Sequence, residues 1–489
     1  MKDDDAARPI SPFAGHAIER SMVELLMYFF LVPGIVYFVV LPKHFIERHC
    51  GMLASSLHGD DSYAALDGAD EEAGAAAPKR PARAYYIDRL RVALTALVVC
   101  HHAVLSFDGS PGSVAAPWGS VVEYTTAQPQ TPIFSRSISA MWFLNLNQLY
   151  FMGLFFFISG YFTPASFDRK GAFAFLKERF KRLAIPCVVY YFLIGPFLEC
   201  WLMPHVITRK SKNKHWTIVE GPPWYLCTLV IFSCVYVACP HDIDRAAPAP
   251  SVGAFLLVGG LFMGVLEHAM SGATLLWLNP VTCYYSVQYV TWFAAGVYAY
   301  RQNWLETIVG YAPSTATFLR CVVVAFAGYL FFAIKALTYF GADNAPTTGS
   351  LEVLGAVWAV AVSLALLHGF GQHNEKPSKL AKAACDAAYA VYVIHPIFLA
   401  LAVWAYAGML SAGHDVTQRI PASVTRGAPI HNDRTFYVRS SEDATDDGPP
   451  RKFGAKSFWG EIFVALFANA MAWPAAYGLK QLPGVRDVL

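Results

Sequence analysis

The stretch "RLRVALTALVVCHHAVLSF", residues 89–107, decides the fold of this chain. Two arginines open it, a nearly unbroken apolar run follows, and His101 and His102 lie in its second half. A helix needs roughly 20 mostly apolar residues to cross a bilayer, so this stretch is long enough to span one. Ionisable residues in such helices are costly and normally face a cavity or the interior of a bundle. The stretch therefore predicts a membrane-spanning helix with a functional face.

Apolar runs of similar length recur along the whole chain. Its 489 residues are 55% hydrophobic and only 15% charged, whereas a soluble domain carries about 25% charged residues. This composition and the runs predict an all-α, polytopic, multi-pass integral membrane protein. The runs lie near residues 22–41, 90–107, 141–164, 183–203, 223–239, 252–270, 282–300, 318–340, 351–370, 385–410 and 457–479.

The polar segments divide these runs into two parts. Residues 51–84 are rich in Ala, Gly and Asp and predict a disordered linker. It separates residues 1–50, which hold the first run, from a body of about ten helices over residues 85–489. The acidic start "MKDDD" and the full length of the first run favour a signal anchor over a cleaved signal peptide. Residues 411–456 form a second long polar loop, which we expect to be disordered rather than a lid.

Charge and cysteine content exclude some classes of function. The net charge is +2, so no nucleic-acid partner is implied. The ten cysteines lie mostly in apolar runs and show no CxxC or Cys/His ligand spacing, so we expect small buried side chains and no metal site. Lys and Arg are concentrated in residues 42–91 and 167–182 but not in the short segments between the alternate spans. The positive-inside rule then places the start of the 90–107 helix on the cytosolic side.

Three ionisable residues share one face of the 90–107 helix and its start. Arg91 and His102 are eleven residues apart, which leaves them about 20° from alignment and about 16 Å apart along the axis. Asp88 lies about 40° to the other side of His102, whereas His101 points about 80° away. The alternative is that Asp88, Arg89 and Arg91 are flanking residues at the membrane interface, which we favour for Arg89, and that His102 is a structural histidine.

Five segments then follow in an order that resembles a known family. The first contains an Arg, ten residues and a His, and the later ones contain SGYF, Arg-x-x-Arg, a Trp helix start and a His-Pro pair. The segments are "YYIDRLRVALTALVVCHHAVLSF" (85–107), "LFFFISGYFTP" (154–164), "FLKERFKRLAIP" (175–186), "GPPWYLCTL" (221–229) and "AYAVYVIHPIFL" (388–399). Together they resemble the acyltransferase 3 family of membrane O-acyltransferases, and the ending "LPGVRDVL" is similar to its branch of bacterial glucan-modifying enzymes. The resemblance covers residues 85–489, and the extra N-terminal helix departs from the family's ten-helix plan.

The resemblance implies a reaction and a catalytic set. The family moves an acetyl- or succinyl-like group from acyl-CoA to a hydroxyl of a carbohydrate or lipid-linked acceptor, with no resident cofactor. A histidine with an ordinary pKa near 6.5 suits the removal of a hydroxyl proton, so His102 is the candidate base. Arg91 is expected to hold the donor or stabilise an oxyanion, with Asp88 beside it. Direct transfer and a transient acyl-histidine both remain open.

Four further residues are candidates for substrate binding. Arg179 and Arg182 are three apart, so they share a helical face, and arginine forks suit the phosphates of CoA. The equally weighted alternative is a positive-inside loop. Trp224 and His395 complete the set, with an interface anchor and a histidine bonded within the bundle as their structural alternatives. Gly160 is expected to allow close helix approach.

Two other function classes use the same residues. A secondary transporter would employ His102, Arg91 and His395 as a proton or anion site, and it predicts inverted repeats, which the sequence lacks. A glycan or lipid exporter would keep the helices without needing a base. Both remain alternatives to the membrane acyltransferase.

Overall fold

The computed structural model describes residues 84–107, 138–198, 221–239, 259–269, 286–310, 348–372, 378–411 and 455–489. Every regular element within these ranges is a helix, as the apolar runs predict, and these ranges contain no strand. The runs at 22–41 and 318–340, nearly all of the 51–84 linker and most of the 411–456 loop lie outside the described residues.

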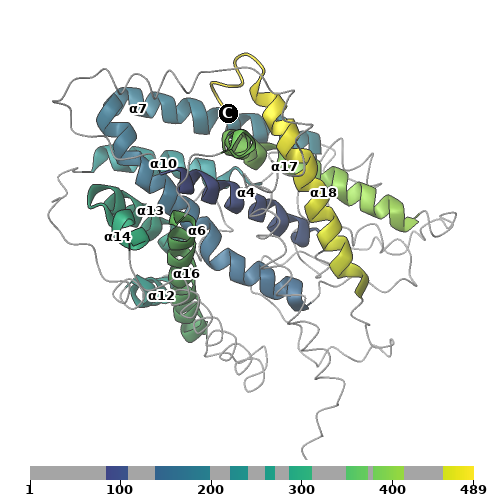
Figure 1. Ribbon diagram of the computed structural model, residues 1–489, viewed down its shortest axis with the longest axis horizontal. Coiled ribbons are helices and arrows are strands. Elements are labelled where there is room, and N and C mark those ends of the chain that lie inside the picture. Colours follow the sequence, from purple (N-terminus) through teal and green to yellow (C-terminus); the bar gives the residue numbers. More distant parts are fainter. Residues whose placement is uncertain are drawn as a thin grey trace, which may run out of the picture.

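The helix that holds His102 lies at the centre of the bundle (Figure 1). This helix, α4 (Tyr85–Leu105), is lined by buried apolar side chains such as Leu90, Leu94 and Val98. It packs against four long helices, and two of them, α17 and α18, also pack along each other. The four are α6 (Ile138–Lys170), α16 (Thr348–Gly371), α17 (Lys379–Ser411) and α18 (Ala455–Lys480). The central position of α4 means that its polar residues face other helices.

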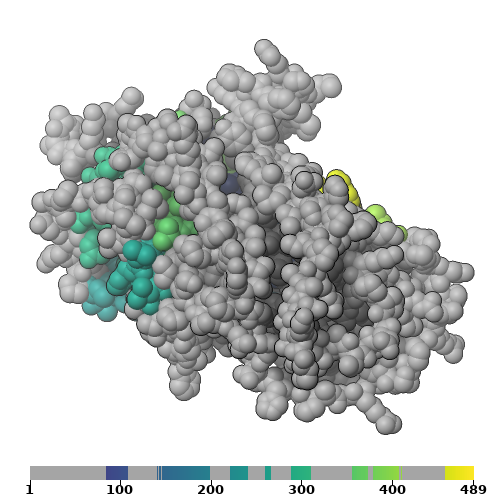
Figure 2. All heavy atoms as spheres, turned by 90° about the horizontal axis from the view of Figure 1, so that it is seen from below, coloured from purple at the N-terminus to yellow at the C-terminus, as the bar shows by residue number. Residues whose placement is uncertain are grey.

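A second group of helices covers the side of α6 and α16. Helix α13 packs along α6, α12 packs against α16 and α13, and α14 packs against α16 and α13. Their bounds are Ser286–Arg301 for α13, Gly260–Ala269 for α12 and Trp304–Gly310 for α14. Viewed from below, the teal and green parts of the chain reach the surface on one side, and the yellow C-terminal part reaches it on the other (Figure 2).

Helices α6 and α13 touch backbone to backbone at two glycines. A Cβ added to Gly160 would lie 2.1 Å from the carbonyl oxygen of Phe293. One added to Gly296 would lie 2.1 Å from the carbonyl oxygen of Phe157. Small residues allow such close crossings of membrane helices, so the prediction for Gly160 is confirmed.

An ion pair ties the adjacent ends of these two helices. Arg301 donates to the Asp168 carboxylate through two nitrogens at 2.5 and 2.8 Å, and to the Tyr236 hydroxyl at 3.1 Å. Hydrogen bonding to the Asp168 carboxylate raises the pKa of Arg301 above its ordinary value. Bidentate pairs of this kind fix geometry as well as add energy.

The basic segment 167–182, for which a helical arginine face and a positive-inside loop were equally weighted, is helical. Helix α6 runs to Lys170, and Gly171, with a φ of 74°, turns the chain into α7 (Ala172–Arg179). The π-helical turn η2 (Phe180–Ala184), the short helix α8 (Ile185–Val189) and a second π-helical turn, η3 (Tyr190–Ile194), follow without a break. Lys, Arg, Glu, Leu and Ala are strong helix formers, and this explains the difference from a loop.

Three of the described helical segments are long and apolar enough to cross a membrane: Leu146–Ile194, Lys379–Tyr406 and Phe458–Lys480. Two shorter apolar helices are Trp224–Ala238 and Gly355–Gly371. On α8 and η3 the large side chains of Val188, Phe192 and Leu193 are exposed. Such outward apolar surfaces suit contact with lipid chains rather than with water.

Candidate functional site

A cavity of about 550 Å³ lies between α4, α6, α7, η2, α17 and the helix α10 (Trp224–Ala238). Its mouth carries the exposed Arg169 and Arg182, where α4 and α17 begin and where α6 and α18 end. Its inner end is lined by Thr95, Tyr225 and Tyr392. The volume falls in the range of small-molecule and cofactor pockets.

The cavity lining is strongly cationic. Three carboxylates, Asp88, Glu178 and Asp386, face a larger number of positive side chains. These cations come from six elements and are Arg91, Arg169, Lys170, Arg179, Arg182, Lys382 and Lys480. A cleft lined mainly by one sign of charge concentrates ligands of the opposite sign. The lining therefore suits an anion with several negative charges.

Arg179 is a partly buried cation of this lining. Its Nη2 donates to the Thr163 hydroxyl at 3.2 Å, and its guanidinium lies 5.1 Å from the centre of the Phe175 ring. No carboxylate in the described part of the chain pairs with Arg179. A shielded cation without a countercharge is costly, so this position favours a bound anion.

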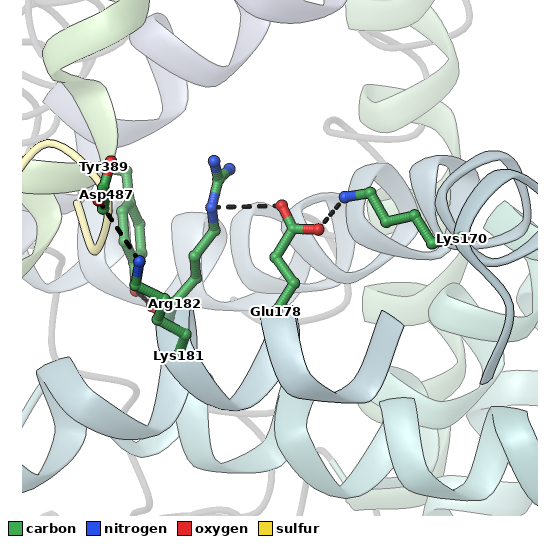
Figure 3. A network of polar contacts seen from close by, with 6 residues as sticks. All are labelled: Lys170, Glu178, Lys181, Arg182, Tyr389 and Asp487. Atoms are coloured by element: carbon green, nitrogen blue, oxygen red, sulfur yellow. Dashed lines mark hydrogen bonds and ion pairs between the residues drawn. The ribbon is translucent and has the colours of Figure 1, made fainter. Parts of the chain in front are cut away.

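Arg182 lines the same cavity at its mouth. Its Nε lies 3.5 Å from one oxygen of Glu178, whose other oxygen accepts from the Lys170 ammonium (Figure 3). The backbone carbonyl of Arg182 accepts a hydrogen bond from the Tyr389 hydroxyl. Figure 3 shows the terminal nitrogens of Arg182 pointing away from Glu178. The structure thus brings Arg179 and Arg182 to one cavity, one inside it and the other at its entrance.

Asp88 and Arg91 also come together near the mouth. Both line the cavity, and the Arg91 Nη1 lies 3.6 Å from an Asp88 oxygen. Thr95, one turn further, donates to the carbonyl oxygen of Arg91 at 2.8 Å. Arg89 is buried, with 6% exposure, so our favoured expectation of a flanking residue at the interface is wrong for it. Asp88 and Arg91 are separated from His102 by three or more turns of α4.

His102 instead meets His395 on α17. The Nδ1 of His102 lies 2.8 Å from the Nε2 of His395, and the two ring planes are 16° apart with their centres 5.0 Å apart. The Nδ1 of the fully buried His395 lies 2.7 Å from the backbone carbonyl oxygen of Tyr392. His101 packs against Phe151 with its ring centre at 5.0 Å. The pair unites two segments that are 293 residues apart in the chain.

The hydrogen bonds of this pair determine which nitrogens carry protons. A carbonyl oxygen only accepts, so the Nδ1 of His395 is the donor to Tyr392. In a neutral His395 the Nε2 is then an acceptor, and the Nδ1 of His102 must donate to it. A neutral His102 consequently carries its lone pair on Nε2. This chain of donors orients one imidazole by another, as outer partners orient catalytic and metal-binding histidines.

The histidine pair lies just beyond the inner end of the cavity. Neither His102 nor His395 lines it, but Tyr392 does, and His395 follows Tyr392 by one helical turn, about 4.5 Å along the axis. Thr95 also lines the cavity and precedes His102 by two turns, about 10 Å.

Hydroxyl groups line this inner end. The Tyr225 hydroxyl donates to the backbone carbonyl of Phe155 at 3.2 Å and lies 2.8 Å from the Ser159 hydroxyl. The hydroxyl of the buried Tyr392 donates to the carbonyl of Pro222. These groups lie in the segments that carry the family resemblance, yet the sequence alone did not single out Tyr225 or Tyr392. The available signal was their position in the sequence, since Tyr225 follows Trp224 and Tyr392 lies three residues before His395.

Trp224 lies outside the cavity lining. It begins α10, and its ring lies 5.4 Å from that of Tyr289 and 6.2 Å from that of Phe156. Its neighbour Tyr225 faces the cavity instead. The cavity is also lined by Lys382 and Asp386 on α17 and by Lys480 on α18. No sequence pattern pointed to these three residues.

The cysteines follow the prediction of burial only in part. Cys100 and Cys187 are buried, Cys227 and Cys385 are partly buried, and Cys234 and Cys239 are exposed. The last two lie on α10 and at its end, where apolar composition reflects a helix surface rather than a core. No group of metal-ligating side chains occurs among the residues that the structure describes.

Comparison with protein families gives one match. The model of the acyltransferase 3 family, described as an acyltransferase domain, matches residues 84–411, from the start of α4 to the end of α17. Comparisons with curated proteins and with solved structures found no match. The match covers more than half of the chain and includes the cavity lining except for its C-terminal residues. The chain therefore belongs to the acyltransferase 3 family and is a membrane acyltransferase.

Proposed function

We propose that this protein is a multi-pass membrane O-acyltransferase. It takes an acyl group from acyl-CoA held in the cationic cavity and passes it to a hydroxyl of a carbohydrate or lipid-linked acceptor. The observation that carries the proposal is the position of the His102–His395 pair one helical turn beyond the inner end of that cavity. This position brings the base close to the thioester end of an acyl-CoA held in the cavity.

The donor fits the cavity by charge and by direction. The phosphates of CoA are the natural partners of the cationic mouth, and Arg179 supplies a guanidinium that lacks a carboxylate partner in the described residues. The pantetheine arm is a linear chain that extends inward from these phosphates. Arg91, paired with Asp88, precedes His102 by about 16 Å along α4, which suits a role on the donor side. The thioester then lies at the inner end, near Tyr225 and Tyr392.

The base in this proposal is the Nε2 of His102. It accepts the proton of the acceptor hydroxyl as the oxygen attacks the thioester carbonyl. The tetrahedral intermediate collapses with cleavage of the carbon–sulfur bond, and the CoA thiolate takes the proton from the His102 imidazolium. His395 is a positioning residue that keeps the lone pair on Nε2. A transient acyl group on the same Nε2 uses the same arrangement and remains an alternative order of steps.

The side of the membrane follows from the same cavity. Its mouth gathers residues from the two Lys/Arg-rich segments, 42–91 and 167–182, that predict the cytosolic face. Acyl-CoA would therefore enter from the cytosol, and no transport of the donor is required.

The test uses full-length protein purified in detergent. Release of free CoA thiol is followed from acetyl-CoA and succinyl-CoA, with and without a mixed glycan and lipid extract. His102→Ala is expected to lower turnover by about 10²- to 10⁴-fold while donor binding stays intact. Arg179→Ala is expected to raise the donor concentration needed for half-maximal rate.

Two matched controls separate chemistry from folding. His368 is a buried histidine on α16 that bonds to the backbone oxygen of Ile308, away from the cavity. Lys177 is an exposed cation on α7 outside the cavity lining. His368→Ala and Lys177→Ala should leave the kinetics near those of the wild type. Failure of the wild type to bind either acyl-CoA would overturn the proposal and favour a transporter.

A further inference from the structure

Two cysteines from different helices meet beside the cavity. The Sγ of Cys187 on α8 lies 3.3 Å from the Sγ of Cys227 on α10. The Cys187 thiol also lies 3.6 Å from the carbonyl oxygen of Pro223, which immediately precedes α10. Cys187 is buried and Cys227 is partly buried. Among the cysteines in the described ranges, these are the two that contact each other.

The local backbone allows the sulfurs to approach further. A disulfide requires a sulfur–sulfur distance of about 2.05 Å, so the two thiols need to close by little more than about 1 Å. Helix α8 has only five residues and lies between the π-helical turns η2 and η3, and Pro186 occupies its first turn. π-helical turns interrupt the regular hydrogen-bond ladder and often mark functional sites. A small shift of α8 toward α10 is therefore easier than in a continuous α-helix.

We propose that Cys187 and Cys227 form a reversible dithiol–disulfide pair that responds to hydroperoxides. The Cys227 thiolate attacks the terminal peroxide oxygen, the O–O bond breaks, and water or an alcohol leaves after taking a proton. The resulting sulfenic acid on Cys227 is attacked by the Cys187 thiolate, which forms the S–S bond and releases water. The two sulfurs together lose two electrons and the peroxide gains them. A dithiol reductant reverses the reaction by thiol–disulfide exchange.

The pair links two walls of the donor cavity. Leu183, which lies one turn before Cys187, lines the cavity from one side, and Leu226, next to Cys227, lines it from the other. A bond between these walls sets their spacing at the depth of Tyr225. The effect on donor use rests on the function proposed above, whereas formation of the bond does not. A displacement of about 1 Å in a catalytic site can cost as much as 10²-fold in rate, so we expect turnover to fall by roughly 10- to 100-fold on oxidation.

The first measurement maps the bond in the full-length wild-type protein. Purified protein is treated with hydrogen peroxide, remaining thiols are blocked with a maleimide, and non-reduced peptides are analysed by mass spectrometry. We expect a cross-linked peptide that joins Cys187 to Cys227, that is two hydrogens lighter than the sum of its parts, and that is lost after dithiothreitol. Only over-oxidised or maleimide-labelled forms of the two cysteines would overturn the proposal.

The second measurement compares variants by CoA release. Wild-type turnover should fall on peroxide treatment and recover with dithiothreitol, whereas Cys187→Ser and Cys227→Ser should keep their activity under peroxide. Cys234→Ser is the matched control, because Cys234 is exposed on the same helix and should leave the response of the wild type unchanged. A cross-link without any change in turnover would refute the control of the cavity but leave the modification site. Absence of acyl transfer in every sample would refute the proposed function, and the mapping would still decide the bond.

Discussion

Removal of His395 isolates the role of the histidine pair. The Nδ1 of His102 donates to His395 in a setting where His395 is fully buried. Without the His395 acceptor, the Nδ1–H of His102 is left unsatisfied, at a cost of about 1 to 3 kcal/mol. The protein avoids this cost if the His102 ring turns or if the proton moves to Nε2. Either change withdraws the lone pair from the acceptor hydroxyl. Because 1.4 kcal/mol corresponds to a factor of ten, His395→Met should lower kcat by roughly 5- to 150-fold.

The assay separates this effect from packing and from donor binding. His395 lies outside the cavity lining, so the KM for acyl-CoA should remain within about twofold of that of the wild type. His395→Gln has a side chain of similar length to Met and provides a carbonyl acceptor, so it should recover part of kcat. In the background of His102→Ala, neither substitution should reduce the rate further.

Three results would refute this reasoning. Equal losses in His395→Met and His395→Gln would show that the acceptor is irrelevant and that packing dominates. A rise in donor KM without a change in kcat would place His395 in substrate binding. Losses that multiply in the double variant His102→Ala/His395→Met would mean that the two histidines act independently.

Further predictions concern the cavity, the pH dependence and the helix crossing. Arg179→Ala should raise the donor KM by at least about tenfold. Arg182→Ala should raise it less, because Arg182 is exposed and already paired with Glu178. Isothermal titration of both variants with CoA checks which one binds the donor more weakly. The proposed base must be neutral, so kcat/KM should rise with pH as His102 loses its proton and then level off. In a pH–rate profile of His102→Gln, the residual activity should not show this rise. Gly160→Ala should lower Tm in a thermal-shift assay by several degrees, since its Cβ would overlap a backbone oxygen of α13, whereas Gly369→Ala, with open space around it on α16, should leave Tm unchanged or raise it slightly.

The helices were predictable because membrane insertion imposes a simple pattern. A lipid-embedded backbone must satisfy its own hydrogen bonds, so long apolar runs become helices, and α4, α10 and α17 lie where those runs are. The basic segment 167–182 was open between a helical arginine face and a positive-inside loop, and it is helical. Charge reports on contact with water and not on backbone conformation, and Lys and Arg also favour helices.

The site was predictable in its members but not in its pairing. Helical spacing placed Asp88, Arg91 and His102 on one face, and the first two do form an ion pair at the cavity. The partner of His102 is His395, which is 293 residues away, and no local period relates two helices that far apart in sequence. The partner was therefore accessible only through a three-dimensional structure.

The close crossing of α6 and α13 at Gly160 and Gly296 also has a mechanical consequence. At Gly160 and Gly296 the two backbones meet without a side chain between them, and the Asp168–Arg301 pair joins the adjacent helix ends. Helix α6, which lines the cavity, is therefore held firmly against α13. The cavity is also lined by η2, which continues into α8 and η3, and the interrupted hydrogen-bond ladder of this segment lets it yield more readily. Adaptation to acyl groups of different size is therefore expected from the π-helical side of the cavity rather than from α6.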